Sequence, residues 1–163
     1  MPEKETLRRA RQDKREGKSA STQAGEFVRE EMHHVREGKH GARSTKQAIA
    51  IGLQKARRSG VKLAAPEKGE ASERTRKSAK SALKHAGEKP SAKRSRAVRG
   101  ALKREGHSAA SKTALSRQAR SAAKKRTAAE RSAAAKKAAR TKGPRERSAA
   151  ARKAARTRAS HAA

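Results

Sequence analysis

Large apolar side chains are concentrated in one short stretch of the chain. Nine of them lie between Phe27 and Leu63, whereas the 100 residues that follow contain only four, namely Leu83, Val98, Leu102 and Leu115. The segment 3–17 has a single one, Leu7. The candidate core is therefore local.

The first half of this stretch has the apolar spacing of a helix. Val28, Met32 and Val35 recur at i, i+4 and i+7, which places them on one helix face. Gly38 follows where a C-terminal stop belongs. The pattern predicts a helix over about 25–37.

A second helix is predicted over about 45–59. Ser44 followed by Gln47 fits a capping box. The apolar positions then continue at i, i+4 and i+7, as Ile49, Leu53 and Ala56.

The end of the second helix is also encoded. Gly60 occupies the position of a left-handed C′ residue, and Val61 is placed to contact Ala56 in a Schellman ending. Ile51 falls off the apolar stripe, so it faces either a third helix or a partner. The two helices, joined by a Gly-flanked loop, form a helical hairpin.

Three parts are expected: an N-terminal charged helix or arm (1–20), a hairpin domain (21–63) and a repetitive tail (64–163). Whether the N-terminal helix docks is left open. In the tail, 78–93 aligns with 97–112 at a shift of 19, and 131–143 with 147–159 at a shift of 16. These repeats hold too few large apolar residues to stack into a solenoid.

The tail is rich in Ala, Lys and Arg, which are strong helix formers. Its breaks are predicted at Gly87, Gly106 and Gly143, with Pro90 and Pro144 suited to first helical turns. No Gly or Pro interrupts 108–142. Because like charges repel at i, i+3 and i+4, these helices should be frayed without a partner.

The fold class expected is mostly α: a small hairpin plus extended basic helices, partly disordered when free, with no β-sheet. The chain has one Phe, no Tyr, no Trp and no Cys, and much of its hydrophobic fraction is Ala, whose burial contributes little. A core for all 163 residues cannot be built from this composition.

The formal net charge is +31, with +8 in residues 1–63 and +23 in 64–163. Such an excess predicts a polyanionic partner, DNA first and RNA as an alternative. In the tail, the candidate nucleic-acid-binding residues are cations separated by Ala and Ser, which let the backbone approach phosphates. They are Lys124, Lys125, Arg126, Lys136, Lys137, Arg140, Arg152, Lys153 and Arg156.

The hairpin carries a second set of candidate phosphate contacts, around its loop and the far end of its second helix. These cations could equally serve only solubility and the helix dipole. They are Lys39, His40, Arg43, Lys46, Lys55, Arg57, Arg58 and Lys62.

Other kinds of site are not expected. Aromatic residues for base stacking and zinc-finger spacing are missing, so base readout lacks its usual means. His33 and His34 are adjacent and diverge by about 100° on a helix, so no metal is predicted. We expect no catalytic residues, cofactor or small-molecule substrate, because an apolar pocket lining is lacking. The chain is predicted not to be an enzyme.

Residues 26–63, and most clearly the run STKQAIAIGLQKARRSG, resemble a small basic bacterial domain of unknown function that carries a plasmid-stabilisation-like or DNA-binding label. The tail is similar in composition to the Lys- and Ala-rich tails of linker histones and bacterial histone-like proteins. The resemblance of residues 26–63 implies a bacterial origin.

Together these features predict a histone-like, nucleoid-associated protein that binds DNA without sequence specificity and neutralises, bridges or compacts it. One alternative is a plasmid stabilisation or partition module whose 27–63 apolar face binds a protein or a second copy, while the tail localises it to DNA. Another is an RNA- or ribosome-associated basic protein. The N-terminus lacks the apolar segment of a signal peptide, so a cytoplasmic location without membrane association is expected.

Overall fold

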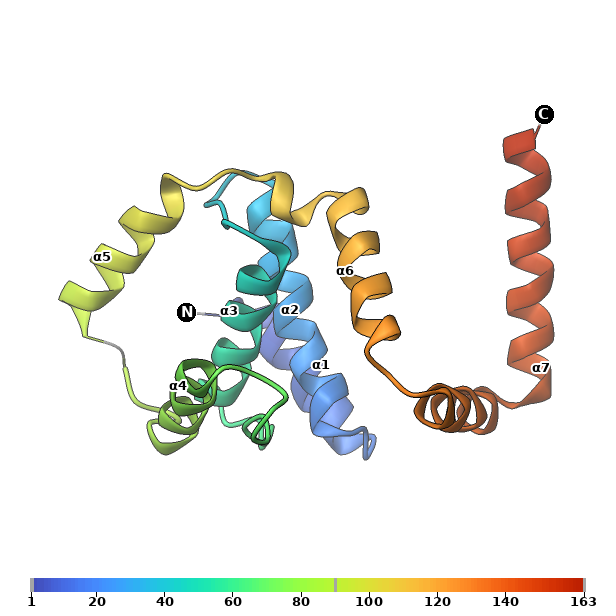
Figure 1. The fold of residues 1–163 in the computed structure, drawn as a ribbon, viewed down its shortest axis with the longest axis horizontal. Helices are drawn as coiled ribbons and strands as arrows, with labels where there is room; N and C mark the ends of the chain where they lie inside the picture. The colour runs from blue at the N-terminus through green and yellow to red at the C-terminus, as the bar shows by residue number, and fades with distance from the viewer. Residues whose placement is uncertain (1, 90, 163) are drawn as a thin grey trace. The chain divides into compact units, whose positions relative to one another are not determined.

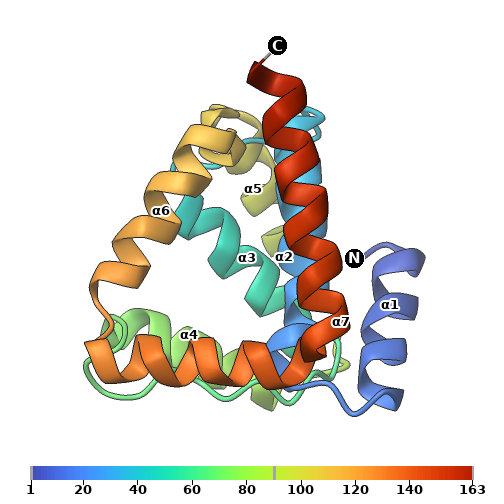
Figure 2. The same cartoon turned by 90° about the vertical axis from the view of Figure 1, so that its right-hand side faces the viewer.

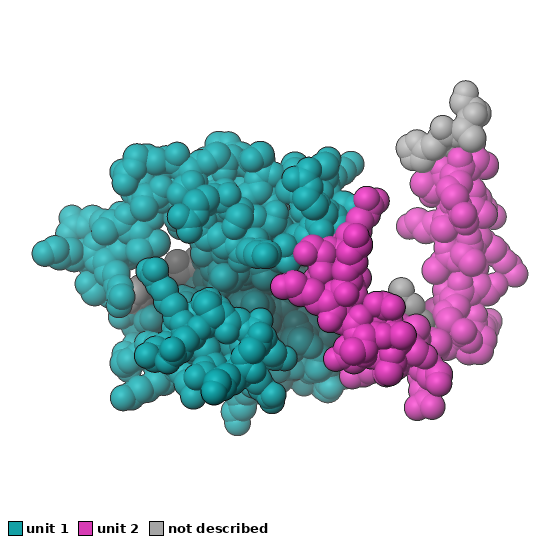
Figure 3. All heavy atoms as spheres, viewed as in Figure 1, with its two compact units in different colours: residues 1–118 teal, residues 119–163 magenta. Residues whose placement is uncertain are grey.

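The computed structural model describes residues 2–89 and 91–162. Within these ranges the regular structure is helical, with one isolated bridge between Lys68 and Ala71 and no sheet (Figure 1). The expected mostly α fold class is confirmed. The chain divides into two compact units, 1–118 and 119–163 (Figure 3).

The first unit begins with α1 (Lys4–Arg15), α2 (Ala20–Arg36) and α3 (Thr45–Arg58). Figures 1 and 2 show α2 and α3 side by side, as the hairpin prediction requires. However, α2 starts five residues before the predicted position 25. The reason is local: the Ser19 hydroxyl accepts a hydrogen bond from the Thr22 backbone N–H and caps the helix earlier.

The predicted helix ends are confirmed. The Val61 N–H donates to the Ala56 carbonyl at 3.1 Å and the Gly60 N–H to that of Arg57, which is the Schellman pattern. Gly60 has φ of +87° and Gly38, after α2, has +73°. A backbone that must adopt positive φ favours glycine at both positions.

The start of α3 differs in one detail from a standard capping box. The Ser44 hydroxyl accepts from the Gln47 N–H as predicted, at 3.2 Å. The Gln47 side chain, however, accepts from the N–H of Arg43, one residue before the cap. The first interaction satisfies a backbone donor that the first turn leaves free, and the second satisfies the donor of the residue just before the cap.

Helices α2 and α3 pack unusually closely at Gly52. A methyl group built on Gly52 would lie 2.7 Å from the Cα of Val28 and 3.0 Å from the carbonyl oxygen of Phe27. Because both neighbours are backbone atoms, only glycine permits this approach.

Two hydrophobic clusters form the core of the unit. The first contains Phe27 and Ala56 with Ala10 of α1, so the N-terminal helix docks on the hairpin, which the sequence left open. The second combines Met32 and Val35 of α2 with Ala42, Ala48, Ala109 and Ala110. Small alanines far along the chain therefore complete the core that the large apolar residues begin.

The segment 102–110 is clipped to the hairpin loop by backbone hydrogen bonds. The Gly41 N–H donates to the Leu102 carbonyl and the Ala42 N–H to the Gly106 carbonyl, both at 2.9 Å. A methyl group on Gly41 would lie 1.8 Å from the carbonyl oxygen of Glu105. The compact unit thus extends well beyond the predicted hairpin domain 21–63.

Side chains strengthen the same connection. The Thr45 hydroxyl donates to the Ala109 carbonyl at 2.6 Å in a buried position. The Arg36 guanidinium donates to the Ala110 carbonyl at 2.8 Å. These contacts join α2 and α3 to a segment more than 60 residues later.

The 19-residue repeat corresponds to two equal helices, α4 (Glu73–Lys84) and α5 (Ala92–Lys103). Their caps, Ser72 and Ser91, are also 19 residues apart. The predicted first-turn role of Pro90 lies outside the described residues.

The two copies differ in their packing. On α4, Ala79 and Ala82 are buried, whereas α5 has no buried residue and Val98, the counterpart of Ala79, is 53% exposed. A Gln54–Ser78 hydrogen bond links α3 to α4. Ile51 lies three residues before Gln54 on α3 and is partly buried, so part of its side chain is covered within the chain.

The rest of the chain forms η1 (Ser108–Ala110), α6 (Lys112–Lys124) and α7 (Ala128–Ala162). Gly143 has φ of +60° and breaks α7, with Pro144 directly after it, as predicted. The Gly- and Pro-free stretch 108–142 is nevertheless not one continuous helix. Thr127 and Glu130 form a capping box that starts α7, at 2.7 and 3.2 Å.

Candidate nucleic-acid interface

The C-terminal unit, 119–163, is a dense array of cations. It holds 15 Lys or Arg and only two acidic residues, Glu130 and Glu146. Nearly all of its described side chains are exposed. Glu130 is engaged at the start of α7, where hydrogen bonds from Thr127 lower the pKa of its carboxyl.

The nine predicted cations of this unit fall into three exposed groups. The first is at the end of α6 and in the break after it, and the other two are on α7, before and after the Gly143 kink. They are Lys124, Lys125 and Arg126; Lys136, Lys137 and Arg140; and Arg152, Lys153 and Arg156. The kink separates helical segments of 15 and 19 residues, about 22 and 28 Å long at 1.5 Å per residue.

The hairpin cations do not behave as one group. Arg43, Lys46 and Lys62 are exposed. Arg57 is buried and donates to the carbonyls of Leu63 and Ala64, and burial lowers the pKa of its guanidinium. Arg57 thus holds the chain after α3.

Arg58 and Lys39 are also engaged within the molecule. The Arg58 guanidinium donates to the Glu88 carbonyl at 3.3 Å. The Lys39 ammonium lies 3.1 Å from a Glu3 oxygen and 3.0 Å from a Glu37 oxygen. Only three of the eight predicted hairpin cations therefore remain free of such contacts at the surface: Arg43, Lys46 and Lys62.

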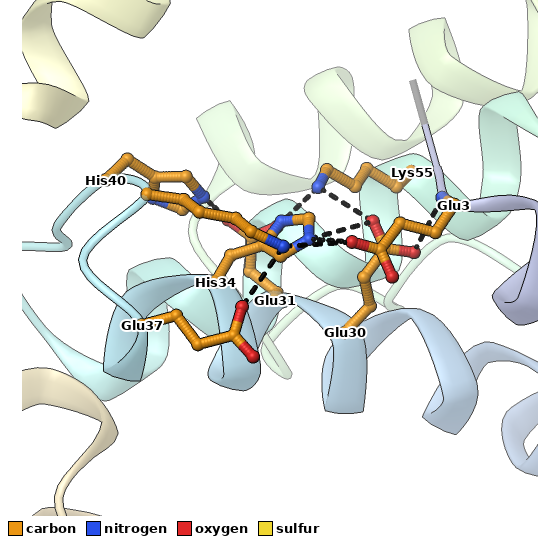
Figure 4. Close-up of polar contacts among 8 residues, drawn as sticks. Glu3, Glu30, Glu31, His34, Glu37, His40 and Lys55 are labelled. Atoms are coloured by element: carbon orange, nitrogen blue, oxygen red, sulfur yellow. Dashed lines mark hydrogen bonds and ion pairs between the residues drawn. The ribbon is translucent and has the colours of Figure 1, made fainter.

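Two others, His40 and Lys55, belong to what we call the buried charge cluster, which comprises Glu30, Glu31, His34, His40 and Lys55 (Figure 4). Glu31 is fully buried, and Glu30 is 3% exposed. The Lys55 ammonium, from α3, lies 2.7 Å from Glu31 Oε2 and 3.4 Å from Glu30 Oε1. A lysine that looks like a phosphate contact in the sequence thus neutralises two buried carboxylates.

Glu3 covers the outer side of the cluster. Its Oε1 lies 2.8 Å from His34 Nε2, and its backbone N–H donates to Glu30. Hydrogen bonds from His34 and Lys39 lower the pKa of the Glu3 carboxyl to about 2. The residues before α1 are thereby attached to the end of α2.

This cluster was not predicted from the sequence. His33 is exposed, whereas its neighbour His34 is partly buried in the cluster. The chain reverses at Gly38 and returns His40 to the face of α2 occupied by His34 and Glu31 (Figure 4). The available signal was the spacing of Glu31 and His34, which is i, i+3 on one helix face.

Comparison with known proteins adds no relative. The chain matches no protein-family profile, and no curated protein and no solved structure is significantly similar to it. The resemblance of 26–63 to a plasmid-stabilisation-like domain therefore stays a prediction. Among the described residues, no helix combines the length and apolar character needed to cross a bilayer.

Proposed function

We propose that the chain binds DNA without strong sequence preference and acts as a histone-like protein that neutralises and bridges or compacts it in a bacterial nucleoid. The observation that carries the proposal is the C-terminal unit, which has 15 cations against two acidic residues in 45 positions and whose described side chains are nearly all exposed. An array of this density has few internal acids to pair with, so its counter-charges come from solution or from a polyanion.

The mechanism is counterion release. B-DNA carries one negative charge per roughly 1.7 Å of its axis, so a helical segment of about 22 Å spans roughly a dozen phosphates. Each Lys or Arg that meets a phosphate displaces a condensed counterion. The Ala and Ser residues between the cations add little bulk, which allows the helix backbone to lie close to the DNA.

Bridging follows from the division of the cations into groups. The Gly143 kink separates two basic segments of α7, and each is a weak binding module on its own. Linking such modules raises the effective concentration of the second after the first has bound. Two segments that meet different duplexes would hold them together.

A salt titration with charge variants tests the proposal. A variant with Gln at the nine tail cations named above should bind with a shallower salt dependence. The magnitude of the negative slope of log K against log salt should fall by up to about 8, at roughly 0.9 per phosphate contact. The matched control replaces Arg43, Lys46 and Lys62 by Gln. It should reduce the magnitude of this slope by no more than about 3. An unchanged slope in the nine-residue variant would refute the role of the tail.

Two further arms define the ligand. Duplexes of different base composition should bind with nearly equal affinity, because contacts to phosphates carry no sequence information directly. Competition between duplex DNA and structured RNA at equal phosphate concentration should favour DNA. Preference for RNA would replace the proposal with the RNA- or ribosome-associated alternative.

A further inference from the structure

We infer that Glu31, His34 and His40 form a binding site for a divalent transition-metal ion such as Zn²⁺, which ties the loop after α2 to that helix. One potential ligand atom from each residue lies within 4.8 Å of the other two. Glu31 and His34 stand on one face of α2, and His40 comes from the loop (Figure 4). The inference is independent of DNA binding by the tail.

Glu31 is a buried carboxylate without well-directed hydrogen-bond partners. Its side chain is fully buried, and neither carboxylate oxygen makes a hydrogen bond of acceptable geometry. Both oxygens do lie near cationic or imidazole nitrogens, Oε1 at 3.2 Å from His40 Nε2 and Oε2 at 2.7 Å from Lys55 Nζ. These contacts are close in distance but poorly directed, so a buried carboxylate is left short of partners. A coordinated cation would satisfy it.

The acceptors beside His34 and His40 indicate which nitrogen of each ring carries the proton. His40 Nδ1 lies 3.0 Å from the Gly41 carbonyl, to which only a protonated nitrogen can donate. In the neutral ring this leaves a lone pair on Nε2, which faces the Glu31 oxygen at 3.2 Å. Two acceptors at that distance repel each other, whereas a metal ion between them is bound by both.

His34 also has one nitrogen beside a hydrogen-bond acceptor. Its Nε2 lies 2.8 Å from Glu3 Oε1, and donation to this carboxylate leaves Nδ1 free to coordinate. Metal-binding histidines characteristically donate their second N–H to a carboxylate or a backbone carbonyl. Both imidazoles of this site do so. Their rings are 5.9 Å apart and nearly perpendicular, so they do not stack against each other.

The separation between the candidate ligand atoms is close to that found around a zinc ion. Nitrogen and oxygen ligands bound at about 2.0–2.1 Å to a tetrahedral zinc ion lie roughly 3.3 Å from each other. The His40 Nε2 to Glu31 Oε1 separation of 3.2 Å already meets this value. The other two separations between ligand atoms are at most 4.8 Å, so His34 and its partners need to approach by no more than about 1.5 Å to share one ion.

The charged groups around the site carry a net negative charge. The ion-pair network around the site contains four carboxylates and two ammonium groups, and with neutral imidazoles its formal charge is −2, which one divalent cation balances. Lys55 can keep its contact with Oε2 while Oε1 binds the metal. The network comprises Glu3, Glu30, Glu31 and Glu37 with Lys39 and Lys55.

The ligand set selects the class of ion. Two imidazoles and one carboxylate suit Zn²⁺, Co²⁺, Ni²⁺ or Cu²⁺, whereas Mg²⁺ and Ca²⁺ prefer oxygen ligands alone. His34 and His40 have side chains 12% and 13% exposed, so an ion can enter from solution.

The test titrates the chelator-treated full chain with Zn²⁺ by calorimetry and with Co²⁺ by visible absorption. We expect one strongly bound equivalent, d–d bands of four-coordinate cobalt, and a higher unfolding temperature with Zn²⁺. His34→Ala and His40→Ala should each weaken binding at least tenfold. The matched control is His33→Ala, which removes an exposed neighbouring histidine and should leave binding unchanged.

A measurement on the wild type avoids dependence on variants that fail to fold. In NMR spectra, Zn²⁺ should shift the ring protons of His34 and His40 and leave those of His33 and His85 in place. Failure of the wild type to bind one equivalent, or equal binding by the His34→Ala and His33→Ala variants, would overturn the inference. Unshifted His34 and His40 signals at saturating Zn²⁺ would also overturn it.

Discussion

Replacing Gly52 by Ala tests the close crossing of α2 and α3. The added methyl carbon would lie 2.7 Å from Val28 Cα and 2.9 Å from Val28 N. Non-bonded carbon atoms prefer about 3.5–4.0 Å, so the helices must separate by roughly 1 Å. The neighbours are backbone atoms and cannot rotate away.

Two opposing terms set the size of the effect. Alanine is a better helix former than glycine by about 0.8–1.0 kcal/mol, which favours the variant. Overpacking of a close interface typically costs about 1–3 kcal/mol and more where the backbone must move. Separation of the helices also loosens Phe27 and Ala56 in the first hydrophobic cluster. We expect a net loss of about 1–3 kcal/mol.

Urea denaturation followed by circular dichroism measures this loss, and Gly25→Ala is its matched control. Gly25 is likewise a helical glycine, in α2, but a methyl group there meets no atom within 4 Å. The control should gain up to about 1 kcal/mol from helix propensity alone. If Gly52→Ala were as stable as Gly25→Ala, the close packing of α2 on α3 would be wrong.

Two further predictions concern the hydrogen bonds that attach the segment 102–110 to the hairpin and the contacts of Glu3 near the N-terminus. Thr45→Val removes the donor to the buried Ala109 carbonyl and should lower the free energy of unfolding by about 1–3 kcal/mol, as measured by urea denaturation. Thr113→Val, at an exposed position, is the control and should change it little. Equal stability of the two variants would contradict the role of this hydrogen bond. The pKa of Glu3 is lowered to about 2 from an ordinary 4.5, so its stabilising contribution is present above about pH 4.5 and is lost as the pH falls toward 2. Wild type should therefore lose more stability than Glu3→Gln between pH 5 and 2 in thermal unfolding, and parallel losses would argue against the contact with His34.

The hairpin could be predicted because its signals are local. Ser44, Gly38 and Gly60 act within one or two helical turns, and the i, i+4, i+7 stripes report the face that each helix buries. The early start of α2 was missed because the Ser19 cap precedes the first large apolar residue of that helix. Caps and apolar stripes are independent signals, and here they begin at different places.

The rest of the first unit depends on long-range packing by residues that look unremarkable in sequence. Ala109 and Ala110 are two among many alanines of the chain, yet they cover Met32 and Val35. Alanine is small enough to fit a tight gap and common enough that no pattern marks such a position. The two copies of the 19-residue repeat show the same limit, since α4 buries two alanines and α5 buries no residue despite matched caps.

The candidate site was predicted only in part, since charge density is visible in sequence and pairing is not. The excess of cations in 119–163 is a matter of composition. Whether Lys55 meets a phosphate or a buried glutamate depends on how α3 crosses α2, which no local signal encodes. His40 likewise reached Glu31 through the direction of the loop after Gly38.

The backbone clip between 41–42 and 102–106 also constrains the order in which the protein can mature during synthesis. When a nascent chain has emerged from the ribosome as far as residue 63, both hairpin helices can form. The alanines at 109 and 110 are still missing, so Met32 and Val35 are not yet covered. Such an intermediate offers chaperones an apolar surface until the later segment arrives. Because translation proceeds from the N-terminus, the folded unit can close before the polycationic residues after 118 leave the ribosome, whose own RNA would compete for them.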